Sequence, residues 1–141
     1  MALVLISSSA ALVDLMNVED KIHIVNTWIE HQHKAHALGK IPEETFWACE
    51  KLYDIVHQQP ELAWELILEI LTTDQSNVIY ENLAAGALED LLVYHGDEYI
   101  DKVEEQAKQN PNFNELLGGV WKNAISEKIW SRVEKARKNV W

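Results

Sequence analysis

The spacing of the apolar residues constrains the fold of this chain more than any other feature of the sequence. Apolar side chains recur three and four positions apart, as they do between Leu62 and Leu71, and this spacing places them on one face of an α-helix. Glycine and proline are scarce, with five and three residues respectively among 141, which leaves few turns for a sheet of many strands. The sequence therefore predicts an all-α fold.

Residues that start and stop helices divide the chain into about seven short helices. An N-cap is expected at Asn17, helix ends at Gly39 and Gly96, and a helix start at Pro42. The segments "HQQPELAWELILEIL" and "KQNPNFNELLGGVW" are also alike, which is typical of stacked repeats. Either an irregular helical bundle or a short HEAT-like stack of helical hairpins fits this pattern.

Length and charge predict a single helical domain over residues 1–141. Within it, residues 1–16 form an apolar helix or arm, and residues 122–141 form a basic C-terminal helix. The net charge is −11, yet residues 120–141 hold six basic and only two acidic side chains. This basic segment is expected either to dock onto the acidic body or to remain free as a separate contact surface.

The acidic surplus and the apolar pattern exclude several classes of partner. A strongly negative chain repels nucleic acid phosphates and anionic lipid, and no run of about 20 apolar residues provides a membrane span. Cys49 is the only cysteine, so no internal disulfide forms, and no Lys or Arg precedes the apolar opening run. We therefore expect a cytoplasmic protein that binds neither nucleic acid nor membrane.

The stretch "LAAGALEDLLVYHG", residues 83–96, contains the most unusual glycine. Gly86 lies inside a helical pattern, where glycine costs about 1 kcal/mol relative to alanine. Close approach of a neighbouring helix, the floor of a ligand or partner groove, and the start of a helix each explain it. For Gly118 and Gly119, close approach of a helix and a groove floor are again possible explanations, and a helix end near Leu117 is a third.

The acidic residues of this stretch, together with those of "ELAWELILEI", suggest a partner-binding surface. Glu89 and Asp90 are adjacent, so they point about 100° apart on a helix and do not form a catalytic pair. Glu65 and Glu69 lie one turn apart on the second stretch. If the two helices lie side by side, their carboxylates form a four-carboxylate patch. The expected partner-binding residues are Glu65, Glu69, Glu89, Asp90 and His95.

No catalytic residue, metal ligand or cofactor is predicted. "HQHKAH" places three histidines close together, but His33 and His36 are three positions apart and His31 faces away from them, unlike the i, i+4 spacing of zinc motifs. Cys49 lies on an apolar face and is interpreted as core filler.

Structural roles are expected for Gly86 and Gly96 and for three aromatic residues. Trp47, Trp64 and Trp121 each flank or join an apolar stripe, so we expect them to lie mainly in the core.

The motifs "FWACEKLYDIVHQQPELAWELILEIL", "LAAGALEDLLVYHG", "NPNFNELLGGVW" and "IWSRVEKAR" resemble those of a small bacterial all-helical domain family of uncharacterised function. The resemblance runs from about Phe46 to Arg137. The family pattern usually has proline after the glycine of the second motif, where this chain has Ala87. The family pattern implies that a helix starts at Gly86, with Glu89 and Asp90 in its first turn. No activity is implied.

Three functions remain as hypotheses. The first is a non-enzymatic acidic interaction protein, an immunity or inhibitor protein that binds a cognate bacterial toxin, because acidic proteins can neutralise basic partners. The second is a helical-repeat adaptor or scaffold. The third is a hydrolase-like enzyme that uses the cluster of Glu65, Glu69, Glu89 and His95. The sequence does not indicate an oligomeric state.

Overall fold

The computed structural model describes residues 16–141, and the arm or helix expected at residues 1–16 falls almost entirely outside this part. The described residues contain helices and no strand, which confirms the all-α fold. The helical elements are α2 (Val18–Leu38), α3 (Phe46–Gln58), α4 (Pro60–Thr73), α5 (Asn77–Leu83), the π-turn η1 (Ala84–Leu88), α6 (Glu89–Gln109), α7 (Pro111–Leu117) and α8 (Glu127–Ala136).

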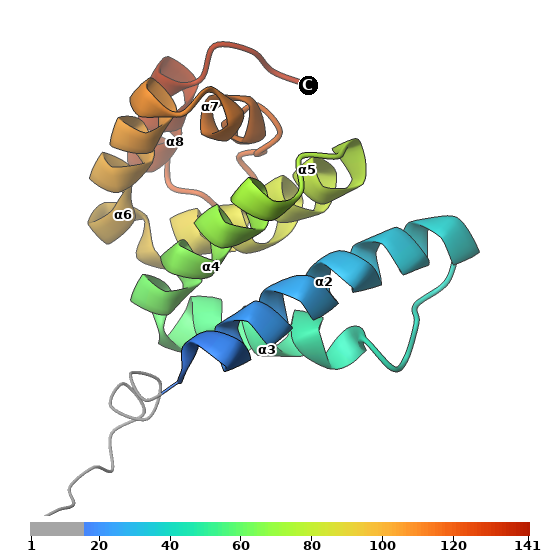
Figure 1. The fold of residues 1–141 in the computed structure, drawn as a ribbon. Coiled ribbons are helices and arrows are strands. Elements are labelled where there is room, and N and C mark those ends of the chain that lie inside the picture. The colour runs from blue at the N-terminus through green and yellow to red at the C-terminus, as the bar shows by residue number, and fades with distance from the viewer. Residues whose placement is uncertain (1–15) are drawn as a thin grey trace, which may run out of the picture.

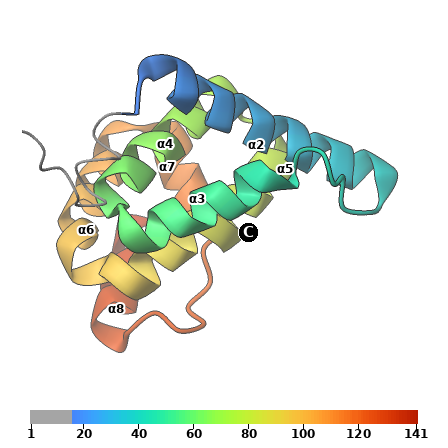
Figure 2. The ribbon, with the colours of Figure 1, turned by 90° about the horizontal axis from the view of Figure 1, so that it is seen from below.

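The helices form an irregular bundle, and α6 runs along one side of it in Figure 1. On one side, α6 contacts α3 and α4, and α2 packs across α3, α4 and α5. On the other side it contacts α7 and α8. Figure 2 shows α3 between α2 and α6. One apolar core, from Ile24 in α2 to Val133 in α8, joins all of these helices.

Several local predictions are confirmed by helix geometry. The Asn17 side chain accepts a hydrogen bond from the Asp20 amide at 2.8 Å, and Gly39 ends α2 in the left-handed region at φ 68°. The expected apolar face of α4 is buried throughout: Leu62, Leu66, Ile67, Ile70 and Leu71.

The expected helix start at Pro42 is wrong, because α3 begins at Phe46. Pro42 is buried in the connection, and residues 43–45 form a turn. Thr45 is held to α2 by a buried hydrogen bond of 2.9 Å with Nδ1 of His31. This tether orients the chain before α3 begins.

The helix end expected at Gly96 lies one residue earlier, at His95, where φ is −135° and ψ is 27° and a kink separates two helical stretches of α6. A Cβ atom at Gly96 would lie 3.0 Å from Cγ1 of Ile129 on α8. Gly96 therefore allows α8 to approach α6 closely.

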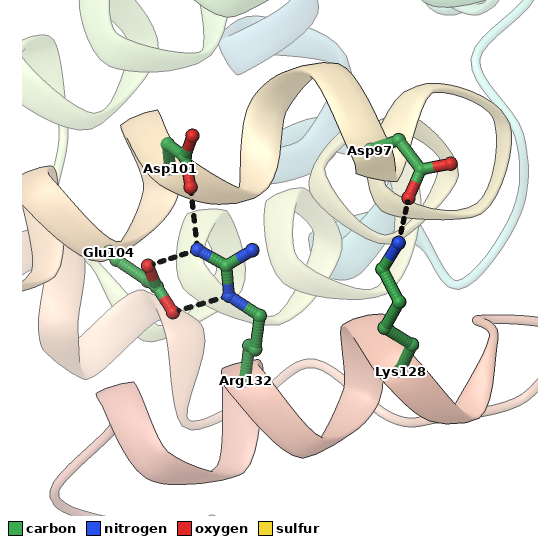
Figure 3. A network of polar contacts seen from close by, with 5 residues as sticks. All are labelled: Asp97, Asp101, Glu104, Lys128 and Arg132. Carbon is green, nitrogen blue, oxygen red and sulfur yellow. Dashed lines mark hydrogen bonds and ion pairs between the residues drawn. The ribbon is translucent and has the colours of Figure 1, made fainter.

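The basic C-terminal segment docks onto the acidic body. Its helix is shorter than the expected 122–141, because α8 covers only Glu127–Ala136. In Figure 3, Lys128 pairs with Asp97 at 3.3 Å, and Arg132 contacts Asp101 at 2.5 Å and Glu104 at 2.6 Å. The Arg132 guanidinium lowers the pKa of Glu104 and is held more firmly protonated in return, with a raised pKa of its own.

After α8 the chain returns along α7 as a strap, residues 137–141. The Trp141 amide donates to the Gly118 carbonyl at 3.1 Å, and its indole Nε1 donates to the Glu115 carbonyl at 2.7 Å. A Cβ atom at Gly118 would overlap the carbonyl oxygen of Asn139. A Cβ atom at Gly119 would overlap the Trp141 ring. Gly118 and Gly119 therefore follow the end of α7 at Leu117 and leave room for the strap.

Only one of the three tryptophans expected in the core belongs there. Trp64 packs against the core, edge-on to Phe113 with ring centroids 5.5 Å apart. Trp47 is 38% exposed and Trp121 is 67% exposed. Trp47 lies near the start of α3, against His23 of α2, and Trp121 directly follows the buried Val120.

No helix within residues 16–141 has both the length and the apolar character that a membrane crossing needs.

The tryptophan environments give a matched pair of substitutions. Trp64→Ala should lower the free energy of unfolding by about 3 kcal/mol, because truncating a large aromatic side chain leaves a cavity in the core. Trp121→Ala should change it by no more than about 0.5 kcal/mol, as for most surface substitutions. Urea unfolding followed by circular dichroism measures both values, and equal losses would contradict the burial pattern.

Two glycine substitutions are expected to change the free energy of unfolding in opposite directions. Gly118→Ala should destabilise the fold by about 1–3 kcal/mol, since the new methyl group displaces the strap. Gly86→Ala should stabilise it by about 0.5–1 kcal/mol, since no atom lies within 4 Å of the new methyl group. Hydrogen exchange of the Trp141 amide should accelerate only in Gly118→Ala.

Candidate functional site

A groove opens on the surface where α2, α3 and the π-turn meet. Its volume is about 210 Å³. Apolar side chains of the three elements form most of its walls, and a few polar groups face the same space. The lining residues are Trp28, Gln32, Cys49, Leu52, Tyr53, Val56, Asn82, Gly86, Ala87 and Asp90.

Gly86 forms part of this groove instead of a helix contact. It lies inside a continuous helical run from Asn77, so the helix start implied by the family pattern is wrong. A Cβ atom at Gly86 would meet no atom within 4 Å, so close approach of another helix is excluded as well. Of the explanations considered, the groove floor is the one that matches this geometry. The π-turn around it supports a functional role, since such turns occur frequently at functional sites.

Asp90 is the charged group of the groove. Its side chain is partly buried and has no hydrogen-bond or ion-pair partner among residues 16–141. Burial raises the pKa of its carboxyl group, and the adjacent Glu89 raises it further, while His57 acts in the opposite direction. Partial burial without an internal partner makes the ionised carboxylate a cost to folding, while its oxygens still reach the groove and the solvent.

A stack of three rings begins at Tyr53 in the groove wall and leads away from the groove. His57 lies between Tyr53 and Tyr94, with ring centroids 4.2 and 4.3 Å apart. Its Nδ1 is 2.8 Å from the Tyr53 carbonyl oxygen, which only accepts, so Nδ1 carries the proton. The other ring nitrogen, Nε2, is buried without a partner. Tyr53 and Tyr94 are 56% and 57% exposed. Tyr53 lines the groove, whereas Tyr94 lines a separate hollow that also contains His95.

The polar side chains on the α2 and α3 walls are already oriented. Gln32 donates from Nε2 to the sulfur of Cys49 at 3.5 Å. Burial raises the pKa of the Cys49 thiol, so it remains protonated near neutral pH and is a poor nucleophile. Asn82 donates from Nδ2 to the Val78 carbonyl at 2.8 Å. The side-chain oxygens of Gln32 and Asn82 are left as acceptors.

The structure brings only Asp90, among the five expected partner-binding residues, into the groove. Glu65 pairs with Lys21 of α2 at 3.0 Å, and Glu69 is exposed on α4. Glu89 accepts a hydrogen bond from Asn123 at 2.9 Å. His95 donates from Nε2 to the His57 carbonyl at 3.2 Å, which links the kink in α6 to the end of α3.

The three clustered histidines lie in different environments. His31 is buried against Thr45, His33 pairs with Asp74 at 2.8 Å, and His36 is exposed. Within residues 16–141, no three His, Cys, Asp or Glu side chains are placed to hold a metal ion together.

Sequence reasoning missed most of the groove wall. Tyr53 and His57 are four residues apart on α3, a spacing that places their rings on one side of a helix, so this pair was detectable. Nothing in the sequence indicated that Tyr94 of α6 would complete the stack, or that Gln32 of α2 would reach Cys49.

Comparison with known protein families adds one finding. The model of a family of unknown function, DUF6869, matches residues 35–140. The chain belongs to DUF6869. The matched region contains the α3, π-turn and α6 parts of the groove, while Trp28 and Gln32 of α2 precede it. Neither the curated proteins nor the solved structures contain a match.

The environment of Asp90 predicts how stability depends on pH. Because its pKa is raised in the folded state, the ionised carboxylate opposes folding above that pKa, and the penalty disappears as pH falls below the ordinary value of about 3.9. Asp90→Asn should therefore raise the Tm at pH 7, and the difference from the parent should shrink toward pH 3. Asp54→Asn, at an exposed position, is the control, with little change at either pH. A lower Tm for Asp90→Asn at pH 7 would show that Asp90 has a stabilising partner.

Proposed function

We propose that this protein is a non-enzymatic interaction protein, an immunity or inhibitor protein that binds a basic bacterial toxin in the cytoplasm. The observation that carries the proposal is the groove at the π-turn, which is lined by the unpaired Asp90 carboxylate and the exposed Tyr53. Tyrosine is enriched at the energetic centres of protein interfaces. A carboxylate without an internal partner gains most from a cation supplied by another molecule.

The distribution of charge over the described residues supports a basic partner. Lys128 and Arg132 are already paired with carboxylates of α6, so the C-terminal segment does not neutralise the rest of the surface. Many exposed carboxylates elsewhere have no cation within ion-pair distance among residues 16–141, including those of Glu50, Asp54, Glu61, Glu69, Glu81 and Glu98. Such a surface attracts a positively charged protein over long distances.

An adaptor function remains the second proposal, because the groove walls are mainly apolar. An adaptor that bound through these walls would show little dependence on salt, since burial of apolar surface is not screened by ions. The enzyme hypothesis has weaker support. Of its proposed cluster, Glu65 and Glu89 are engaged with Lys21 and Asn123 respectively.

The dependence of association on ionic strength tests the proposal. The partner is isolated from the native host with the protein as bait, and binding is followed by stopped flow at 20 mM and 500 mM salt. We expect the on-rate to fall by about tenfold or more at high salt, because screening removes the electrostatic attraction. An on-rate unchanged across this range would contradict a basic partner and favour the adaptor.

Charge reversal locates the surface. Glu50→Lys and Asp54→Lys on α3, close to the groove, should lower the on-rate while the fold remains intact, because an exposed helix charge contributes only about 0.3–0.5 kcal/mol. Glu134→Lys on α8 is the matched control, with an exposed carboxylate of the basic segment. An equal decrease for all three variants would mean that net charge matters and the α3 surface does not.

A further inference from the structure

The hydrogen-bonding groups and the charge of the groove at the π-turn indicate what kind of group binds there. Among its polar side chains, Gln32 and Asn82 use their NH₂ groups internally, toward the Cys49 sulfur and the Val78 carbonyl. Their oxygens have no donor among the described residues, and the Asp90 carboxylate also lacks one. Uncharged donors also line it, in the Trp28 indole, the Tyr53 hydroxyl and the second N–H of each amide. The one charged group, the Asp90 carboxylate, accepts, so the best complement of the groove is a cation that donates hydrogen bonds.

The guanidinium group of arginine is such a donor. It carries five N–H groups, no acceptor and a permanent positive charge. Its planar shape allows it to stack on an aromatic face while its edge donates two parallel hydrogen bonds to a carboxylate. Tyr53 lines the groove together with Asp90, and its ring is more than half exposed. Lysine would place one compact ammonium group at a single acceptor, and it stacks less well.

We propose that the groove receives an arginine side chain projecting from the surface of the partner protein. This inference rests on the proposed function and deepens it, because it names the partner group that fills the site. Asp90 pairs with the guanidinium, Tyr53 stacks on it, and the oxygens of Asn82 and Gln32 accept the remaining donors. Gly86 keeps the floor clear, since any side chain at that position would project into open space near Asp90.

The size of the groove agrees with one long side chain. Its volume of about 210 Å³ is below the roughly 300–1,000 Å³ of pockets that enclose whole small ligands. An anionic ligand such as a phosphate would meet the Asp90 carboxylate in a groove that contains no cationic side chain. The site therefore favours a single cationic side chain over a phosphorylated ligand.

A nuclear magnetic resonance titration tests this directly. The ¹⁵N-labelled protein is titrated with N-acetyl-arginine amide and, separately, with N-acetyl-citrulline amide, which has nearly the same shape without the charge. The Gly86 and Asp90 amides and the Trp28 indole N–H, all from residues that line the groove, are the reporters. We expect saturable shifts with the arginine probe and at least tenfold weaker binding of the citrulline probe. Equal binding of the two probes would overturn the proposal.

Two neutralising variants separate direct contact from general charge. Asp90→Asn should abolish the preference for arginine over citrulline. Glu89→Gln removes the same charge one residue away, outside the groove, and should preserve that preference. Gly86→Leu should weaken the arginine probe by filling the space above the floor. Retained preference in Asp90→Asn, or equal losses in Asp90→Asn and Glu89→Gln, would refute a specific guanidinium site.

The partner complex distinguishes this inference from the broader proposal. Asp90→Asn should raise the off-rate of the complex by about tenfold and change the on-rate little, whereas reversals at Glu50 and Asp54 act on the on-rate. If the on-rate depends on salt but Asp90→Asn leaves the off-rate unchanged, the arginine inference fails and the basic partner stands. If association is insensitive to salt but the probe titration succeeds, the basic partner fails and the guanidinium site stands.

Discussion

The burial of the long helical run from Asn77 to Gln109 is the constraint on which the rest of this structure depends. This run contacts α2, α3 and α4 on one side and α7 and α8 on the other, so it needs apolar residues around much of its circumference. Leu83, Leu88, Leu91 and Leu92 are almost completely buried. A straight helix would not match both sets of neighbours, and the bend at His95 directs its second half along α8. Gly96, directly after the bend, then allows Ile129 to pack closely.

The apolar pattern predicted which helices form, but it did not predict how they meet. Spacing of three and four residues identified the buried face of α4, and capping residues located Asn17 and Gly39, because these signals act within a few residues. The start of α3 depends on a hydrogen bond between His31 and Thr45, which joins two helices. The exposure of Trp47 and Trp121 has a similar origin. Both residues lie beside an apolar stripe. Such a residue is buried only if another helix packs over that side, and the sequence of the stripe does not specify where the other helices pack.

The candidate site shows the same division between local and long-range information. Gly86 and Asp90 were noticeable in the sequence because an interior glycine and an acid pair are costly or unusual in a helix. Their meaning depends on α2 and α3, which bring Gln32, Cys49 and Tyr53 to the same space. The carboxylates of Glu65 and Glu89 resembled that of Asp90 in the sequence, yet Lys21 and Asn123 engage them. Asp90 differs from the other carboxylates because it lacks a partner among the described residues and also lines the groove, and both properties are set by the three-dimensional packing.

The π-turn between α5 and α6 has a consequence for how the length of this chain can vary. A π-turn contains one residue more than the α-helical turn it replaces, and each residue of an α-helix rotates the chain by about 100°. Because both kinds of turn complete about one revolution, loss of a single residue between Ala84 and Leu88 would restore a regular α-helix and leave α5 and the leucines of α6 nearly in phase. The extra residue would be lost from the stretch that contains Gly86, so the groove would change shape while the core stayed packed. We therefore expect the residue count at the π-turn to set the shape of the binding surface more than the stability of the fold.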